Sequence, residues 1–218
     1  MASTIQITSN NIETDSAVDT HKSNSSVETV AAMHAFEIAT APPVLADNAT
    51  LVAYLADLIN AIYIDAEQGF WKEGVFARCS ITDIQAYIRT GQLAIAWREG
   101  SSQSRPKDLA GCVRMQMLDE RTGEFGMLVC DPGRRGAGIG RGLVEFAEDW
   151  AREQGAAVMQ LELLYPDGWE QAIKARMAVW YSAMGYKMVR VAEMVDELPQ
   201  LVHALARPSK VRVYHRDL

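Results

Sequence analysis

Residues 126–142 read GMLVCDPGRRGAGIGRG, an apolar run that ends at Asp131-Pro132 and gives way to two arginines and a glycine-rich turn. Glycines at a strand-to-helix turn let the backbone approach a ligand closely, with several N–H groups pointing outward. The positive end of the following helix also attracts anions. We therefore expect this stretch to bind a phosphorylated cofactor.

Two common phosphate loops do not fit the spacing. The P-loop pattern GxxxxGK[ST] needs Lys and Ser or Thr after the glycines, and the chain has neither there. The dinucleotide fingerprint GxGxxG fails because its last position falls on Arg141 or Leu143. Glu162 lies about 20 residues further on, where a ribose-binding acid is expected. It also suits an ordinary position in the alternating run 159–163.

A third spacing fits, Arg/Gln-x-x-Gly-x-Gly, as Arg135, Gly138 and Gly140. It resembles the acetyl-CoA loop of the GNAT superfamily of N-acetyltransferases. The resemblance implies acetyl-CoA as co-substrate. It also implies an α/β (α+β) fold, with a mixed, mostly antiparallel sheet flanked by helices and splayed strands that form the acetyl-CoA cleft.

A second segment, residues 174–186, resembles the family ending N-x-x-A-x-x-[FLW]-Y-x-x-x-G-[FY]. Tyr181, Gly185 and Tyr186 match this pattern. Lys174 stands at the Asn position, where the family hydrogen-bonds the pantetheine arm, and Met177 stands at the Ala position. Lys174 can supply a donor, reach a CoA phosphate or point to water.

Periodicity places the elements around these motifs. Period-2 and apolar runs predict strands at 36–40, 92–97, 109–117, 123–129, 158–164, 186–194 and 211–215. Helices are expected after a cap at Asp47 or Asn48, after Ser80 or Thr82, from Ile139 to a stop at Gly155, and before Gly185. The last has an apolar stripe of Ile173, Met177, Trp180 and Met184. The order β-α-α-β-β-β-α-β-α-β-β is that of the GNAT fold, so we expect residues 35–218 to be a GNAT domain.

The resemblance also implies a donor site. Gly126 suits a bulge in the central strand, after which the backbone of Leu128 and Val129 would bind pantetheine and stabilise the oxyanion; core packing is the alternative for both. The residues expected to bind the cofactor are Leu128, Val129, Arg134, Arg135, Gly136, Ala137, Gly138, Ile139, Gly140, Arg141 and Lys174.

Acetyl transfer needs a base for the amine and an acid for the leaving thiolate. Glu124 lies on the central strand, where many family members place the general base, although a carboxylate at a strand start is often only solvated. Tyr181 corresponds to the tyrosine that protonates the sulfur, and it lies one residue off the apolar stripe.

The first helix carries Asn60, Tyr63 and Glu67 at helical spacing, either as a solvated face or as residues that bind the acceptor. We expect the acceptor to be a small-molecule amine or amino-sugar. A protein lysine or N-terminus is the alternative, and a non-catalytic CoA-binding module is a further one.

Composition limits the partners. A net charge of −7 argues against a nucleic-acid surface. Cys79, Cys112 and Cys130 lack the spacing of metal ligands, so no metal is expected. We expect them to be reduced thiols in a cytoplasmic protein. No apolar run appears long enough for a membrane, and the start lacks a signal peptide. Residues 1–34 are rich in Ser, Thr, Asn, Asp and Glu and predict a flexible polar tail. A homodimer is an expectation from the family.

Overall fold

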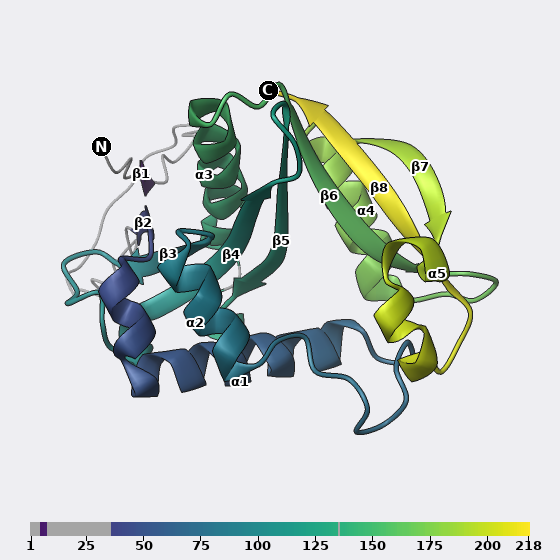
Figure 1. Cartoon of the computed structure of the whole chain (residues 1–218), viewed down its shortest axis with the longest axis horizontal. Coiled ribbons are helices and arrows are strands. Elements are labelled where there is room, and N and C mark those ends of the chain that lie inside the picture. The colour runs from purple at the N-terminus through teal and green to yellow at the C-terminus, as the bar shows by residue number, and fades with distance from the viewer. Residues whose placement is uncertain (1–4, 8–35, 135) are drawn as a thin grey trace, which may run out of the picture.

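The computed structural model describes residues 5–7, 36–134 and 136–218, and its strands form one sheet in the order β1-β2-β3-β4-β5-β6-β8-β7 (Figure 1). Its strands are β1 (Ile5–Ile7), β2 (Phe36–Thr40), β3 (Leu93–Arg98), β4 (Leu109–Met117), β5 (Thr122–Cys130), β6 (Val158–Pro166), β7 (Lys187–Glu193) and β8 (Ser209–Asp217). Neighbouring strands are antiparallel except β5 and β6, which are parallel. The expected mixed, mostly antiparallel sheet is confirmed.

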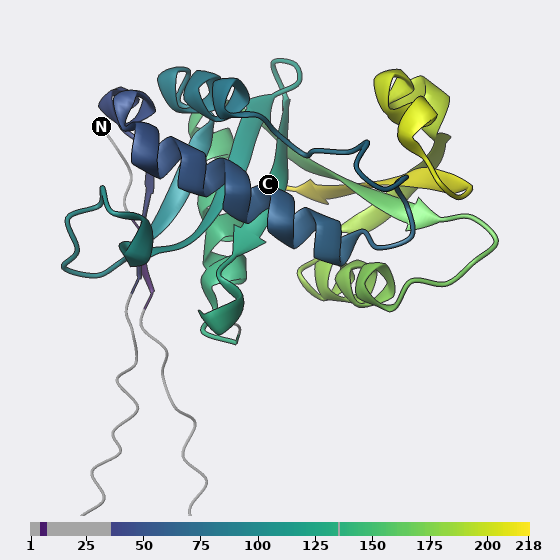
Figure 2. The ribbon, with the colours of Figure 1, turned by 90° about the horizontal axis from the view of Figure 1, so that it is seen from below.

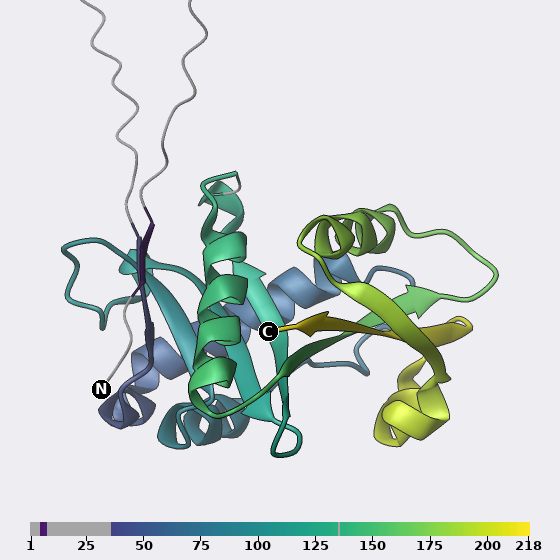
Figure 3. The ribbon, with the colours of Figure 1, turned by 90° about the horizontal axis from the view of Figure 1, so that it is seen from above.

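Helices cover both faces of the sheet. They are α1 (Ala49–Ala66), α2 (Ile81–Arg89), α3 (Ile139–Glu153), α4 (Ala172–Ala183) and α5 (Met194–Glu197), with a 3₁₀ helix, η4 (Pro199–Ala204), after α5. Figures 2 and 3 show α1 and α2 on one face and α3 and α4 on the other, with α5 on the α1 side. Sequence periodicity predicted α1 to α4, whereas the short α5 and η4 were not expected.

Each face of the sheet has its own apolar core. The α1 side buries Leu51, Leu55 and Ile59 against Ile95 and Val129. The α3 side has a second set of buried residues: Val113, Met115, Phe125, Leu143, Phe146, Ala147 and Leu161. A strand whose successive side chains point to opposite faces serves both cores, which is why β4 and β5 are apolar at most positions.

Local sequence signals begin and end the helices where expected. The Asn48 carboxamide accepts a hydrogen bond from Leu51 N at 3.1 Å and caps α1. Ser80 and Asp83 form a reciprocal capping box at the start of α2. Gly155 and Gly185 follow α3 and α4 with φ of 94° and 93°, a left-handed conformation that glycine adopts without steric cost.

Three residues of the predicted tail form structure. Ile5–Ile7 pairs antiparallel with β2 and adds an edge strand to the sheet. An edge strand such as β2 offers a row of unpaired backbone groups, which a short extended segment can satisfy. The remainder of the tail lies outside the described residues.

Helix α1 meets the length and composition of a membrane-spanning helix, with 18 residues and a mean hydropathy of 1.4. The expectation that no apolar run reaches that length is therefore wrong by this measure. Core helices pass the same test, and one face of α1 packs on the sheet through Leu51, Leu55 and Ile59. The expected cytoplasmic location stays a prediction.

Candidate functional site

The sheet splits between β5 and β6. These strands pair only from Thr122–Val158 to Glu124–Gln160, while β6 continues to pair with β8 as far as Pro166. Beyond Glu124 the two strands diverge, and the space between them opens a cleft. The expected splayed strands are confirmed.

A bulge in β5 lies at the start of the split. Cys112 pairs with Val129 and Arg114 with Gly126, so that Val113 lies opposite both Met127 and Leu128. Met127 has a φ of 49°, a left-handed conformation that is costly for a residue with a side chain. The sequence suggested Gly126 for the bulge, and the structure places it one residue later, at a buried Met whose side chain packs in the α1-side core.

The glycine loop joins β5 to α3 and leaves backbone donors accessible. Gly136 and Gly138 have φ of 86° and 80°, and Gly138 is the N-cap of α3 without any side-chain cap. The first N–H groups of α3 therefore have no side-chain acceptor, and an anion can fill that place. Asp131 accepts from Gly133 N at 3.0 Å and from Arg134 Nε at 3.2 Å, which shapes the turn.

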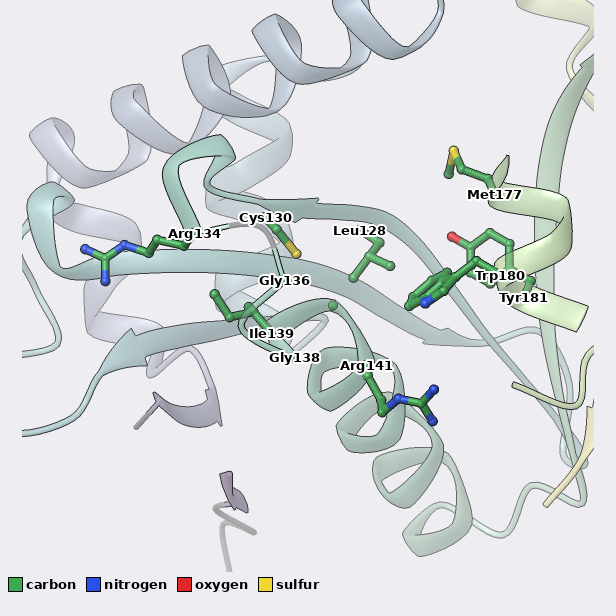
Figure 4. A pocket seen from close by; sticks show the side chains of 11 residues that line it. Leu128, Cys130, Arg134, Gly136, Gly138, Ile139, Arg141, Met177, Trp180 and Tyr181 are labelled. Atoms are coloured by element: carbon green, nitrogen blue, oxygen red, sulfur yellow. The ribbon is translucent and has the colours of Figure 1, made fainter. Parts of the chain in front are cut away.

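A cavity of about 430 Å³ lies over this loop, between β5, the first turn of α3, and α4; we call it the donor cavity (Figure 4). Seven of the residues expected to bind cofactor line it: Leu128, Arg134, Gly136, Gly138, Ile139, Gly140 and Arg141. Arg141 and Arg134 extend in opposite directions from the loop, and the Arg134 side chain pairs with Asp131. The loop backbone and the size of the cavity fit a phosphorylated cofactor.

Three of the remaining expected cofactor residues lie elsewhere, and one is outside the described residues. Val129 is buried in the α1-side core, so only its backbone can face the cleft. Ala137 packs against the α3-side core. Arg135 lies outside the described residues. Lys174, the fourth, does not reach the donor cavity.

Lys174 is 2% exposed, and its Nζ donates to Glu67 Oε1 at 2.8 Å. The expectation that it binds cofactor or points to water is therefore corrected, because the carboxylate at the end of α1 holds it. Burial lowers the pKa of Lys174, and the adjacent Glu67 carboxylate opposes that shift. The other carboxylate oxygen of Glu67, Oε2, accepts a hydrogen bond from Trp71 Nε1 at 2.7 Å.

Tyr181 projects from α4 toward Leu128 on β5, beside Trp180 (Figure 4). It was expected to lie off the apolar stripe, yet it is 4% exposed, whereas Ile173, Met177 and Trp180 are only half-buried. Burial raises the pKa of its phenol above the usual range, so the group stays protonated at neutral pH. No hydrogen bond links its hydroxyl to another residue in the described part of the chain.

A second, small cavity of about 80 Å³ continues from the donor cavity through the split in the sheet; we call it the junction. Leu128, Met177 and Tyr181 line both. Tyr181 therefore lies where the donor cavity meets the junction.

A third cavity of about 450 Å³, the acceptor cavity, lies on the α1 side and shares six residues with the junction: Arg78, Phe125, Gly126, Met127, Glu162 and Leu198. Glu124 lines the acceptor cavity, and its Oε2 accepts a short hydrogen bond from Gln116 Nε2. Burial, and then the nearby carboxylate of Glu124, raise the pKa of Glu162 to about 7.

The three residues of α1 expected at the acceptor site have different roles. Tyr63 and Glu67 line the junction. Asn60 lines none of these cavities, because its carboxamide accepts from Arg78 N at 2.7 Å and donates to Cys79 O at 2.9 Å. Asn60 thus positions the loop that carries Arg78.

The sequence patterns gave no acceptor role to two residues that line this cavity, Arg114 and Glu162. Charged residues inside apolar strands were the available signal, as at Arg114 in β4 and Glu162 in β6. Within the described residues no cluster of three or more His, Cys, Asp or Glu could hold a metal ion.

The comparisons with known proteins agree with this geometry. The model of the acetyltransferase (GNAT) family matches residues 57–168. A search of curated proteins found no match. Solved structures that resemble the chain include YncA of Salmonella typhimurium, described as an acetyltransferase and bound to acetyl-CoA, with a TM-score of 0.57 and 14% identity over 84% of this chain and 94% of that one.

Two others have different acceptors in their names. Ribosomal-protein-alanine N-acetyltransferase from Brucella melitensis has a TM-score of 0.54 and 16% identity, covering 83% of this chain and 99% of that one. Aminoglycoside 6'-N-acetyltransferase bound to coenzyme A has a TM-score of 0.53 and 14% identity, covering 76% and 89%. At such identities the likeness shows a shared fold.

The chain belongs to the acetyltransferase (GNAT) family. It is an acetyl-CoA-dependent N-acetyltransferase, and acetyl-CoA is its co-substrate. The relatives act on small molecules and on proteins, so the class of acceptor is a separate question.

Proposed function

We propose that this enzyme acetylates the primary amine of a small molecule. The observation that supports the proposal is that two segments far apart in the sequence border the acceptor cavity. Phe76, Ala77 and Arg78 border it on one side, and Leu198, Gln200 and Leu201 of the α5–η4 region on another. A cavity of about 450 Å³ bordered on these two sides favours a small acceptor over a peptide.

Backbone hydrogen bonds tie these borders together. Lys72 N donates to Ala204 O and Ala206 N donates to Phe70 O, both at 2.8 Å. Trp71 and Leu205 form an antiparallel bridge between the same segments. The two segments that lead to these borders are therefore joined, which favours a small acceptor over an extended peptide.

Acetyl-CoA supplies the activated acetyl group as a thioester. We assign the proton acceptor to Glu162, which lines both the junction and the acceptor cavity and has a pKa of about 7, near the ideal for a base at neutral pH. Glu124, the base expected from the sequence, lines only the acceptor cavity and raises the pKa of Glu162. Glu162 takes the proton of the ammonium group, directly or through a water.

The amine nitrogen then bonds to the carbonyl carbon as the carbon–sulfur bond breaks. Backbone N–H groups at Leu128 and Val129, beside the bulge, stabilise the negative charge on the carbonyl oxygen. Tyr181, which its raised pKa keeps protonated at neutral pH, gives its phenolic proton to the departing sulfur, and the extra proton left on the nitrogen returns to the tyrosinate, directly or through a water.

Thiol release from acetyl-CoA against a panel of small amines and lysine-containing peptides tests the proposal, with mass spectrometry to identify the acetylated product. We expect turnover with small amines and little with peptides. Turnover confined to peptides would contradict it and favour the protein acetyltransferase.

A further inference from the structure

Two arginines face the acceptor cavity from different elements. Arg78 precedes α2, Arg114 lies on β4, and both side chains are half-buried and line this cavity. Each guanidinium lies over a tyrosine ring, with Arg78 Cζ 4.7 Å from the centroid of Tyr63 and Arg114 Cζ 4.5 Å from that of Tyr87. Stacking satisfies the flat face of a guanidinium and leaves its N–H edge for an acceptor.

Among the described residues no carboxylate lies within ion-pair distance of either edge, although Glu67 and Glu162 interact with Arg78 at longer range. Arg114 Nη2 donates to the neutral Gln116 Oε1 at 2.5 Å, and its Nε is buried without any hydrogen-bond partner. Neither arginine forms an ion pair with another described residue. Arg216, by contrast, is half-buried and pairs with Glu148 at 2.8 Å. A guanidinium edge that lines a cavity without a carboxylate partner can bind an anionic ligand through charge-assisted hydrogen bonds.

The acidic residues of the same cavity are Glu124 and Glu162. Glu162 also lines the junction, toward Tyr181, whereas Arg114 lines only the acceptor cavity. Glu162 thus lies where the amine must react, and Arg114 lies farther from the donor, where Gln116 separates it from Glu124. Arg78 borders both parts.

We propose that the acceptor carries a carboxylate besides its primary amine, as an amino acid does, and that Arg78 and Arg114 bind that carboxylate. This inference rests on the proposed small-molecule function. Lys174, the other cation beside the junction, is already neutralised by Glu67 and takes no part. The carboxylate orients the acceptor so that its amine faces Glu162 and the split in the sheet.

The test uses the full chain and acetyl-CoA with matched triplets: an amino acid, its carboxamide and its decarboxylated amine, for example L-leucine, L-leucinamide and isoamylamine. Hydrogen bonds to a charged group are worth about 10- to 100-fold in binding. We expect kcat/KM for the better acids to exceed that of their amides and amines by at least this factor. Equal turnover of acid, amide and amine would overturn the inference and leave the proposed function standing, whereas turnover of peptides alone would overturn both.

Variants locate the carboxylate. Arg78→Gln and Arg114→Gln should each raise KM for the acid about 10- to 100-fold and leave KM for acetyl-CoA and for the carboxamide unchanged. Arg212→Gln is the matched control, since Arg212 is also half-buried over a tyrosine, Tyr165, but lines none of the three cavities. If either cavity variant does not fold, inhibition of the wild-type enzyme tests the role of the two arginines instead. A carboxylic acid without the amine should compete with the acceptor, and its methyl ester should not; equal inhibition by both would contradict the role of the arginines.

Discussion

Lys174 Nζ donates to Glu67 Oε1 at 2.8 Å, and this buried ion pair joins α4 to the end of α1 across 107 residues of sequence. Nearby, Gln171 Nε2 donates to Ala66 O at 2.9 Å between the same two helices. The position of Lys174 is one where the family ending has Asn. In this chain it connects the two sides of the split sheet instead of contacting the donor cavity.

Removing one partner of this ion pair should lower the free energy of unfolding, and removing the second partner as well should restore most of it. Lys174→Met leaves the Glu67 carboxylate buried without its cation, which typically costs about 3–5 kcal/mol, and the double variant with Glu67→Gln should recover most of that. Urea unfolding measures both. The exposed pair Arg89–Asp47 is the control, and Arg89→Met should cost less than about 1 kcal/mol. Equal losses from the two single variants would contradict the structural role of Lys174.

Tyr181→Phe tests the general acid. We expect kcat to fall about 10²- to 10⁴-fold at neutral pH, with KM for acetyl-CoA little changed, because only the proton for the leaving sulfur is removed. The ring stays in its buried position against Phe125, so the fold is retained. Unchanged turnover at neutral and at high pH alike would remove Tyr181 from the mechanism.

The pH dependence distinguishes the two carboxylates. A base must be deprotonated to act, so wild-type kcat/KM should rise with pH through about 7, the pKa of Glu162. Glu162→Gln should abolish this limb and lower kcat/KM about 10²- to 10⁴-fold. Glu124→Gln should move the limb to lower pH, because it removes a negative charge that raises the pKa of Glu162. If Glu124→Gln abolishes the limb instead, Glu124 is the base.

The ionised form of Glu162 should lower the free energy of unfolding. Its pKa is raised in the folded state, so the stability it contributes is present below the unfolded pKa and is lost as pH rises through about 7. Glu162→Gln should therefore unfold at higher urea than wild type at pH above about 7, by on the order of 1–2 kcal/mol after allowance for partial exposure. Below the ordinary pKa of a glutamate, about 4.3, the two should be alike. A constant difference at all pH values would mean that the charge is not the cause.

The glycine loop makes a prediction for the co-substrate. Gly138→Ala places a side chain at a φ of 80°, which costs about 1–2 kcal/mol and disturbs the first N–H groups of α3. We expect KM for acetyl-CoA to rise about tenfold or more. Gly91→Ala, at a φ of 68° after α2 and far from the donor cavity, carries a similar strain and should lower stability without changing this KM. A similar rise of this KM in both variants would contradict a role of the loop in binding acetyl-CoA.

Much of the fold follows from local sequence. The period-2 and period-3.6 patterns placed α1 to α4 and the strands from β2 to β8, because each element must bury one stripe of side chains. The glycine spacing identified the donor loop for a similar reason, since left-handed turns and an uncapped helix start depend on a few adjacent residues. The predicted buried face of α4 was wrong by one residue, since Tyr181 is buried and Trp180 only half-buried. Burial there depends on how α4 packs against β5 and α1.

The acceptor side depended on tertiary structure. Lys174 and Glu67, or Arg114 and Glu162, are far apart in the chain, and no local pattern relates them. A carboxylate in an alternating strand is usually solvated. In this protein the split between β5 and β6 buries Glu162 near Glu124, and that burial changes its pKa. The sequence by itself determined the donor and the family, because backbone conformation is local. Only the packing of distant strands and loops decided which charges meet in the acceptor cavity, because burial and electrostatic coupling act through space.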